Sequence, residues 1–206
     1  MKVILDDRFL TDEPRTLAQA IDMGVDAASA GGRVVVDIIA DGRSVRTDEL
    51  DDAKAMAHAC DEVRLTSAEP RSFIRVTLLD AREALGEARS AQADAADLIE
   101  AGSVSDAFAS INTSLRLWQA ARQALDQGAQ LLGLDLTTLP LADSEQLPKA
   151  IASLTAGLEE VRRCVACEDW AALGDVLRYD LDELVETWQS LLERVATHIV
   201  SEDVSA

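Results

Sequence analysis

From Pro70 onward, the apolar residues of this chain recur at alternating spacings of four and three. Residues at this spacing share one face of an α-helix, so each stretch predicts an amphipathic helix with one buried face. Pro70 suits the first turn, where its missing N–H would have no helical partner anyway. The pattern is divided into four segments by Gly102-Ser103, by a loop containing Gly133, Pro140 and Pro148, and by Glu168-Asp169. Four amphipathic helices joined by connections of this kind predict an antiparallel bundle over residues 70–200.

The apolar stripes are built mainly from Leu, Ile, Val and Ala. The first stripe runs from Ile74 to Ile99 and is broken by Gln92. The second consists of Val104, Phe108, Ile111, Leu115, Trp118, Leu125, Ala129 and Leu132, with Arg122 as its polar position. The third consists of Leu147, Ile151, Leu154, Leu158, Val161 and Val165, and the fourth of Leu173, Leu177, Leu181, Leu184, Trp188, Leu191 and Val195. The same stripes can pair between two copies, so a homodimer is the alternative to a bundle within one chain.

The first 69 residues follow a different pattern. Short apolar stretches on either side of Asp6-Asp7 predict a β-hairpin. Thr16 and Gln19 have capping-box spacing, and the helix that they begin should end at Gly31-Gly32. The β-branched run "RVVVDIIADGRSV" then contains Asp41-Gly42, a two-residue hairpin turn. After a polar stretch, "DEVRLTS" alternates as a last short strand.

This order of elements, ββαββ, resembles that of ubiquitin-like β-grasp domains. The resemblance covers residues 1 to about 69 and implies an α+β chain with a small β-grasp-like domain at 1–69. Ubiquitin-like modifiers and sulfur carriers end in a free Gly-Gly tail, whereas here the strand continues through Ser67-Ala68-Glu69-Pro70 into a helix. We therefore expect a docking module or a structural cap. The end of the chain, "SEDVSA" at 201–206, carries no stripe and is expected to be a flexible tail.

The charge of the chain excludes several classes of partner. It has 38 acidic and 19 basic residues, a net charge of −19. Such a surface repels nucleic-acid phosphates and anionic membranes, so neither is an expected partner. The apolar runs are too short to span a bilayer, and the opening "MKVILDDRFL" reaches an acidic pair too early for a signal peptide. We expect a cytoplasmic protein whose acidic surface serves solubility or attracts a basic partner.

The segment "VRRCVACEDWAALGD" places Cys164 and Cys167 three residues apart, on one face of a predicted helix. A structural zinc site needs four ligands, and His58 and Cys60 would have to supply the other two. A redox pair would instead need a thiolate at a helix N-terminus in positive surroundings. Neither arrangement matches a known spacing or context. We therefore interpret the cysteines as small apolar residues of a reduced protein, with zinc as the alternative.

Other catalytic or cofactor signals are missing from the sequence. The chain has two histidines, His58 and His198, no G-x-S-x-G elbow, and no glycine-rich loop before a helix. The carboxylates of "RYDLDELVE" are expected to form a solvated acidic face. We therefore predict no enzymatic activity and no cofactor.

Protein binding is the function that the sequence favours. Trp170, at the start of a helix, is the best candidate for an exposed anchor, whereas Trp118 and Trp188 lie on core stripes. The predicted partner-binding residues are Trp170, Leu173, Leu177, Tyr179 and Trp188. The alternatives to an adaptor or chaperone-like protein are a structural zinc protein and a self-associating structural protein.

Two resemblances accompany this prediction. In its acidic, helical and non-catalytic character, the C-terminal module resembles flagellar and secretion chaperones. The whole chain resembles an uncharacterised bacterial family that joins a β-grasp-like start to a helical bundle ending in an "LxxLLxYxLxxxxxxW"-like stretch. Here that stretch is "LGDVLRYDLDELVETW", which departs from the pattern at Asp175-Val176. The family implies no activity for the chain.

Overall fold

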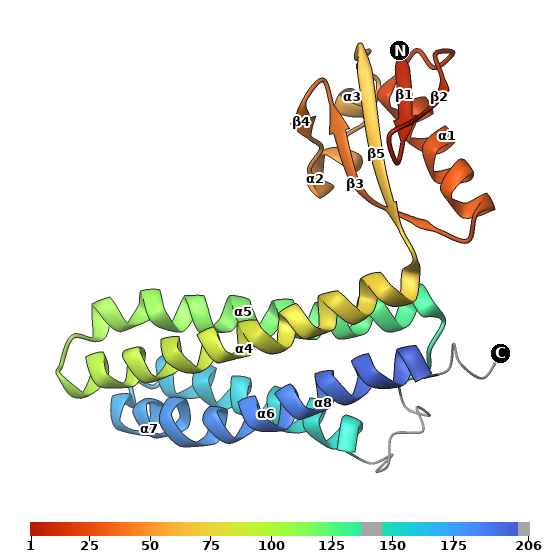
Figure 1. Cartoon of the computed structure of the whole chain (residues 1–206). Coiled ribbons are helices and arrows are strands. Elements are labelled where there is room, and N and C mark those ends of the chain that lie inside the picture. Colours follow the sequence, from red (N-terminus) through yellow and green to blue (C-terminus); the bar gives the residue numbers. More distant parts are fainter. Residues whose placement is uncertain (137–145, 202–206) are drawn as a thin grey trace. The chain divides into compact units, whose positions relative to one another are not determined.

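The computed structural model describes residues 1–136 and 146–201, and it has the mixed α+β content that the sequence predicts. The chain divides into two compact units, Met1–Phe73 and the part from Ile74 onward. We call them the N-terminal unit and the helical unit (Figure 1).

The N-terminal unit contains one mixed five-stranded sheet. Its strands lie in the order β2-β1-β5-β3-β4, with β1 parallel to β5 and the other neighbours antiparallel. The strands are β1 (Lys2–Leu5), β2 (Arg8–Thr11), β3 (Val34–Ala40), β4 (Arg43–Ser44) and β5 (Glu62–Ala68). Both predicted hairpins are present, and β5 is the central strand.

The two hairpin turns have the same construction. Asp6 and Asp7 have φ values of 48° and 62°, and Asp41 and Gly42 have 48° and 81°, the left-handed pairs of type I′ turns. The first Asp of each turn also binds the central strand. Asp41 Oδ1 accepts the N–H groups of Asp61 and Glu62 at 2.9 Å each, next to the start of β5, while Asp6 binds Ser67 near its end. Asp at these positions thus forms the turn and ties it to β5.

Helix α1 (Leu17–Ala30) packs its apolar face against β1 and β5. Thr16 caps it as predicted, accepting the Gln19 N–H at 3.3 Å, but the Gln19 side chain accepts from Arg15 N–H rather than completing the box. The polar stretch after β4 forms two one-turn helices that the sequence pattern does not reveal, α2 (Thr47–Leu50) and α3 (Ala53–Met56).

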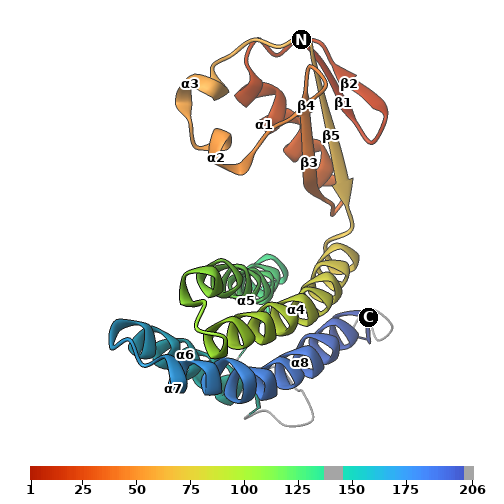
Figure 2. The same ribbon diagram turned by 90° about the vertical axis from the view of Figure 1, so that its left-hand side faces the viewer.

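The helical unit is formed by α4 (Pro70–Glu100) from Ile74 onward, α5 (Val104–Leu132), α6 (Gln146–Ala166), α7 (Trp170–Asp175), the π-helical turn η1 (Val176–Asp180) and α8 (Leu181–Ser201). Figures 1 and 2 show α4 and α5 side by side in one layer, with α6, α7 and α8 in a second. Glu69 caps α4, because its carboxylate accepts the N–H groups of Arg71 and Ser72.

Two predictions at the ends of these helices are wrong. Pro148 was predicted in a loop but lies in the first turn of α6, where proline is tolerated. Ser201, predicted to start the tail, is the last residue of α8. Pro140 and residues 202–206 lie outside the described residues.

A buried polar pair separates two apolar clusters in the helical unit. The larger cluster draws on α4, α5, α6 and α8 and includes Leu85, Trp118 and Trp188. The smaller one includes Ala95, Ile111, Cys164, Leu173 and Leu177. Between them along α4 and α5, the Gln92 amide donates to Ser114 Oγ at 3.1 Å. Both side chains are almost fully buried.

The predicted stripe of α5 is wrong at Phe108 and only partly buried at Leu115 and Arg122, whereas Ala129 is buried as predicted. Phe108 is 37% exposed, and Leu115 and Arg122 lie at the margin of the core. The residue before each of these three is buried and small, namely Ala107, Ser114 and Ala121, and Gly128 is a fourth small buried residue on the same face. The reason is the close approach of α4 to α5, since a Cβ on Gly128 would lie 2.7 Å from Ile74 Cγ2.

Candidate functional site

The helical path from Trp170 to Ser201 is interrupted by a π-turn. Asp169 caps the start of α7, since its carboxylate accepts the Ala172 N–H at 3.2 Å. At η1, the N–H of Leu181 donates to the carbonyl of Val176, five residues back. Leu173, Leu177 and Leu181 follow two consecutive steps of four, and all three side chains are buried. On a regular helix these steps overshoot the apolar face by about 80°, and the extra residue of a π-turn absorbs the drift.

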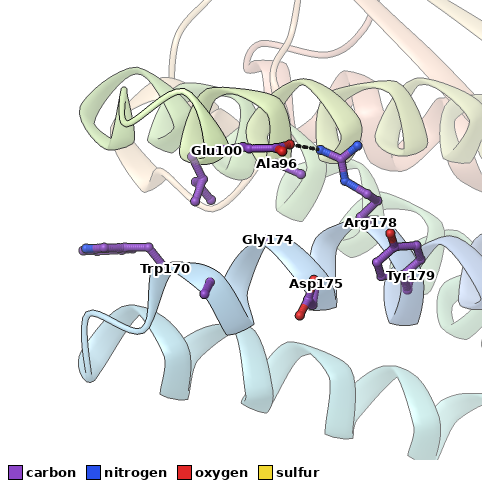
Figure 3. Close-up of a pocket in the computed structure, with 9 residues that line it drawn as sticks. Ala96, Glu100, Trp170, Gly174, Asp175, Arg178 and Tyr179 are labelled. Atoms are coloured by element: carbon purple, nitrogen blue, oxygen red, sulfur yellow. Dashed lines mark hydrogen bonds and ion pairs between the residues drawn. The ribbon is translucent and has the colours of Figure 1, made fainter.

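A surface pocket of about 520 Å³ lies where α7 and η1 face the end of α4. We call it the α7 pocket, and it is lined by Ala96, Ile99, Glu100, Trp170, Ala171, Gly174, Asp175, Arg178 and Tyr179. Figure 3 shows Trp170 and Tyr179 at its two ends, with Gly174 and Asp175 between them. π-Turns occur frequently at functional sites, which makes this pocket the best candidate site in the described residues.

The charges at the α7 pocket join α4 to η1. The Arg178 guanidinium donates to Asp97 at 2.7 Å and to Glu100 at 3.3 Å. The hydrogen bond to Asp97 raises the pKa of Arg178, so this side chain stays charged at any physiological pH. Because all three groups are exposed to solvent, the ion pairs hold geometry more than they add stability.

The two aromatic residues of the pocket differ in how far they are buried and packed against other side chains. Trp170 is half-buried and packs edge-to-face with Phe108 of α5, with ring centroids 6.2 Å apart and planes at 90°. Tyr179 is 61% exposed. The pocket therefore offers one anchored aromatic ring and one accessible ring.

The structure divides the five predicted partner-binding residues into two groups. Trp170 and Tyr179 line the pocket, as a docking surface requires. Leu173, Leu177 and Trp188 are buried in the core, so a partner that docks on the folded chain does not touch their side chains. Trp188 stacks edge-on against Trp118 with ring centroids 6.0 Å apart, and its Nε1 donates to the Ala150 carbonyl at 3.2 Å. For these three, the stripe position already indicates packing.

Several pocket residues come from a part of the chain that sequence reasoning did not connect with Trp170. Ala96, Ile99 and Glu100 belong to the last turns of α4, about seventy residues earlier. The predicted acidic face of "RYDLDELVE" is exposed, and Glu186 together with the neighbouring Asp182 also forms surface ion pairs with Arg89 of α4, at 3.1 Å and 2.7 Å. No sequence signal reveals which ends of the helices meet.

The C-x-x-C pair lies at the end of α6 with its two thiols in different surroundings. Cys164 is buried and contacts Arg163 and Glu160, whereas Cys167 is exposed beyond the helix end. Burial raises the pKa of the Cys164 thiol, the opposite of what a redox nucleophile needs. The position of Cys164 in the smaller apolar cluster matches the packing interpretation, whereas this interpretation is wrong for the exposed Cys167.

The other two zinc candidates lie in the N-terminal unit. His58 and Cys60 border a shallow hollow of about 500 Å³ together with Asp41 and Glu49. Burial, with the nearby carboxylates of Asp41 and Asp61, raises the pKa of the Cys60 thiol. In residues 1–136 and 146–201, no three side chains of the His, Cys, Asp or Glu type come together as a metal site.

In the described ranges, no helix combines the length and apolar character that a bilayer crossing requires. Comparisons with protein-family models, with curated proteins and with solved structures find no significant match to this chain.

Proposed function

We propose that this chain is a non-enzymatic protein-binding protein of the adaptor or chaperone type, and that its partner docks on the α7 pocket. The observation that carries the proposal is the presence of Trp170 and Tyr179 on the same surface hollow. Trp and Tyr dominate the residues that contribute most to protein–protein affinity. The chain has only three Trp and one Tyr, and the other two Trp are buried.

Gly174 supports a binding role for the pocket. A Cβ at this helical position would meet no atom within 4 Å. Alanine there would favour the helix by about 1 kcal/mol, so packing does not require glycine. Glycine does, however, leave the floor of the pocket bare between Trp170 and Tyr179.

The proposal also includes a β-grasp fold for the N-terminal unit, a four-helix bundle for the helical unit and a cytoplasmic location. The strand order β2-β1-β5-β3-β4, with a parallel central pair and α1 on one face, supports a β-grasp fold for the N-terminal unit. The joint cluster of α4, α5, α6 and α8 supports an antiparallel four-helix bundle. Three free cysteines, of which Cys167 is exposed, support a reducing cytoplasmic location. The resemblance to secretion chaperones and to a bacterial family stays a prediction.

The test captures proteins from the source organism on the immobilised intact chain, identifies them, and measures affinity with purified components. The variants are Trp170→Ala, Tyr179→Ala and the control Leu131→Ala. Leu131 is 46% exposed on α5 and lies outside the pocket. We expect each pocket variant to weaken the complex about tenfold or more, and the control to leave it unchanged.

Tyr179→Ala removes an exposed side chain, so this variant separates binding from folding. A partner held equally by all three variants would dock elsewhere and contradict the proposal. A chain that captures only itself would favour the self-associating alternative, which light scattering would reveal as a dimer.

A further inference from the structure

The α7 pocket carries an unbalanced negative charge. Glu100, Asp175 and Arg178 are the charged residues that line it. The Arg178 guanidinium is already paired with Asp97 and Glu100. Within the described part of the chain, the exposed Asp175 carboxylate makes no ion pair and no side-chain hydrogen bond. Asp175 is thus a carboxylate at the pocket whose counter-charge is not supplied by the protein itself.

Aromatic rings on both sides of Asp175 narrow the choice of ligand. Trp170 and Tyr179 lie at the two ends of the pocket in Figure 3, and Asp175 lies between them. The faces of Trp and Tyr attract cations and also pack against alkyl chains. A Lys or Arg side chain matches both features, because its stem is apolar and its head is charged.

The negative charge of the chain argues against four other kinds of ligand at the α7 pocket: nucleic acids, anionic lipids, a second copy of the chain and an uncharged apolar segment. Nucleic acids and anionic lipids bring phosphates toward a chain of net charge −19. A second copy brings the same negative charge. An uncharged apolar segment would remove the Asp175 carboxylate from water without pairing it, which is unfavourable. A basic segment is attracted to the whole surface and neutralises Asp175 on arrival.

We infer that the α7 pocket binds a basic segment of a partner protein, with a Lys or Arg cation paired to Asp175 and its alkyl stem packed on Trp170 or Tyr179. This inference rests on the proposed function, because it names the chemistry of the partner that docks there. Gly174 has a direct role in it, since a bare pocket floor lets a long unbranched side chain lie across the helix.

The test uses fluorescence anisotropy with the intact chain and three labelled synthetic peptides. One is an amphipathic Leu–Lys peptide, and the others replace every Lys by Gln or by Glu. We expect the Lys peptide to bind, the Gln peptide to bind at least tenfold more weakly, and the Glu peptide not to bind. Asp175→Asn should weaken the Lys peptide about fivefold and Tyr179→Ala about tenfold.

The matched control is Glu83→Gln, an exposed carboxylate on α4 about 25 Å along the helix from Glu100. It removes the same charge and should leave the affinity unchanged. An equal loss in Asp175→Asn and Glu83→Gln would mean general attraction to an acidic surface and would overturn the inference. Equal affinity for the Lys and Gln peptides, or no binding of the Lys peptide, would also overturn it.

Failure of this inference and failure of the proposed function are distinguishable. A captured natural partner could lose affinity for the Tyr179→Ala variant while the Lys peptide does not bind at all. The proposal that partners dock on the α7 pocket would then hold, but the inference that the docked segment is basic would be wrong. A dimer in light scattering that Tyr179→Ala dissociates would make a second copy the occupant. If a natural partner binds the Tyr179→Ala variant with unchanged affinity, the α7 pocket is not its docking surface.

Discussion

The Asp6 carboxylate binds Ser67 through both of its oxygens. Oδ1 accepts the Ser67 N–H at 2.7 Å, and Oδ2 accepts the Ser67 hydroxyl at 2.6 Å. Arg33 Nε donates to the same hydroxyl at 2.7 Å. The turn between β1 and β2 is thereby tied to the end of β5. The hydrogen bonds from Ser67 hold the pKa of Asp6 below its usual range.

Asp6→Asn should destabilise the N-terminal unit at neutral pH by about 1 kcal/mol, because a charge-assisted pair becomes neutral at a partly exposed site. Asn accepts the left-handed φ of 48°, so the turn itself is kept. Since the folded pKa of Asp6 is depressed, its contribution is present above the unfolded value of about 3.9 and is lost as pH falls through the folded value.

Hydrogen exchange at β5 amides, measured from pH 7 downward, resolves this effect from the helical unit. The difference between wild type and Asp6→Asn should shrink below about pH 4. Asp7→Asn is the control, because Asp7 lies in the same turn with its side chain 96% exposed. A difference that persists unchanged at low pH would show that the carboxylate charge is not responsible.

Gly128→Ala should lower the stability of the helical unit by about 1–3 kcal/mol. The new Cβ would lie 2.7 Å from Ile74 Cγ2, and a β-branched side chain has little freedom to move away. Gly86→Ala is the control, because its Cβ would meet nothing closer than 3.9 Å and alanine favours the helix. Urea unfolding followed by tryptophan fluorescence should give a lower midpoint for Gly128→Ala and a higher one for Gly86→Ala. A raised midpoint for both would disprove the close contact.

The buried Gln92–Ser114 pair should show strong coupling in a double-mutant cycle. Ser114→Ala leaves the buried Gln92 amide without its acceptor and should cost about 1–3 kcal/mol. Gln92→Met combined with Ser114→Ala should restore or exceed wild-type stability, because Gln92 Oε1 is buried with no hydrogen-bond partner in the described structure. Additive losses in urea unfolding would show that the hydrogen bond contributes nothing.

The three cysteines should react with a thiol reagent at three different rates. Cys167 is exposed and should react first, and Cys60 is half-buried and should follow. Cys164 is buried with a raised pKa, so its reaction should require opening of the smaller apolar cluster. Cys167→Ser should remove only the fast phase. A fast phase of two thiols in the native protein would contradict the burial of Cys164.

Gly174→Ala should stabilise the helical unit by up to about 1 kcal/mol while weakening partner binding. The added methyl group meets no atom of the chain but lies on the floor of the α7 pocket. Unfolding and binding measured on the same preparation test both expectations. Unchanged affinity would mean that the partner does not enter the pocket floor.

The sequence alone predicts those features that depend on neighbours along the chain. Asp-Asp and Asp-Gly dipeptides identify the hairpin turns because few residues adopt φ near 48°. Thr16 begins α1 and Pro70 begins α4 by local capping chemistry. The 4-3 period marks the helices because burial of one face requires it. The π-turn is not among these features, because Leu17, Ile21 and Val25 have the same spacing as Leu173, Leu177 and Leu181 in a regular helix.

Only the tertiary structure decided which face of α5 is buried and what makes up the α7 pocket. A stripe chosen for size selects Phe108 and Leu115, whereas the close approach of α4 demands Ala107, Ser114 and Gly128. The same packing brings Glu100 of α4 to the pocket that Asp175 also lines, and leaves Trp170 half-buried while Trp188 is fully buried. Periodicity along the chain shows that a helix buries one face. The distance between two helices, however, depends on residues far apart in the chain. This distance decides which side chains are buried in the core and which line the pocket.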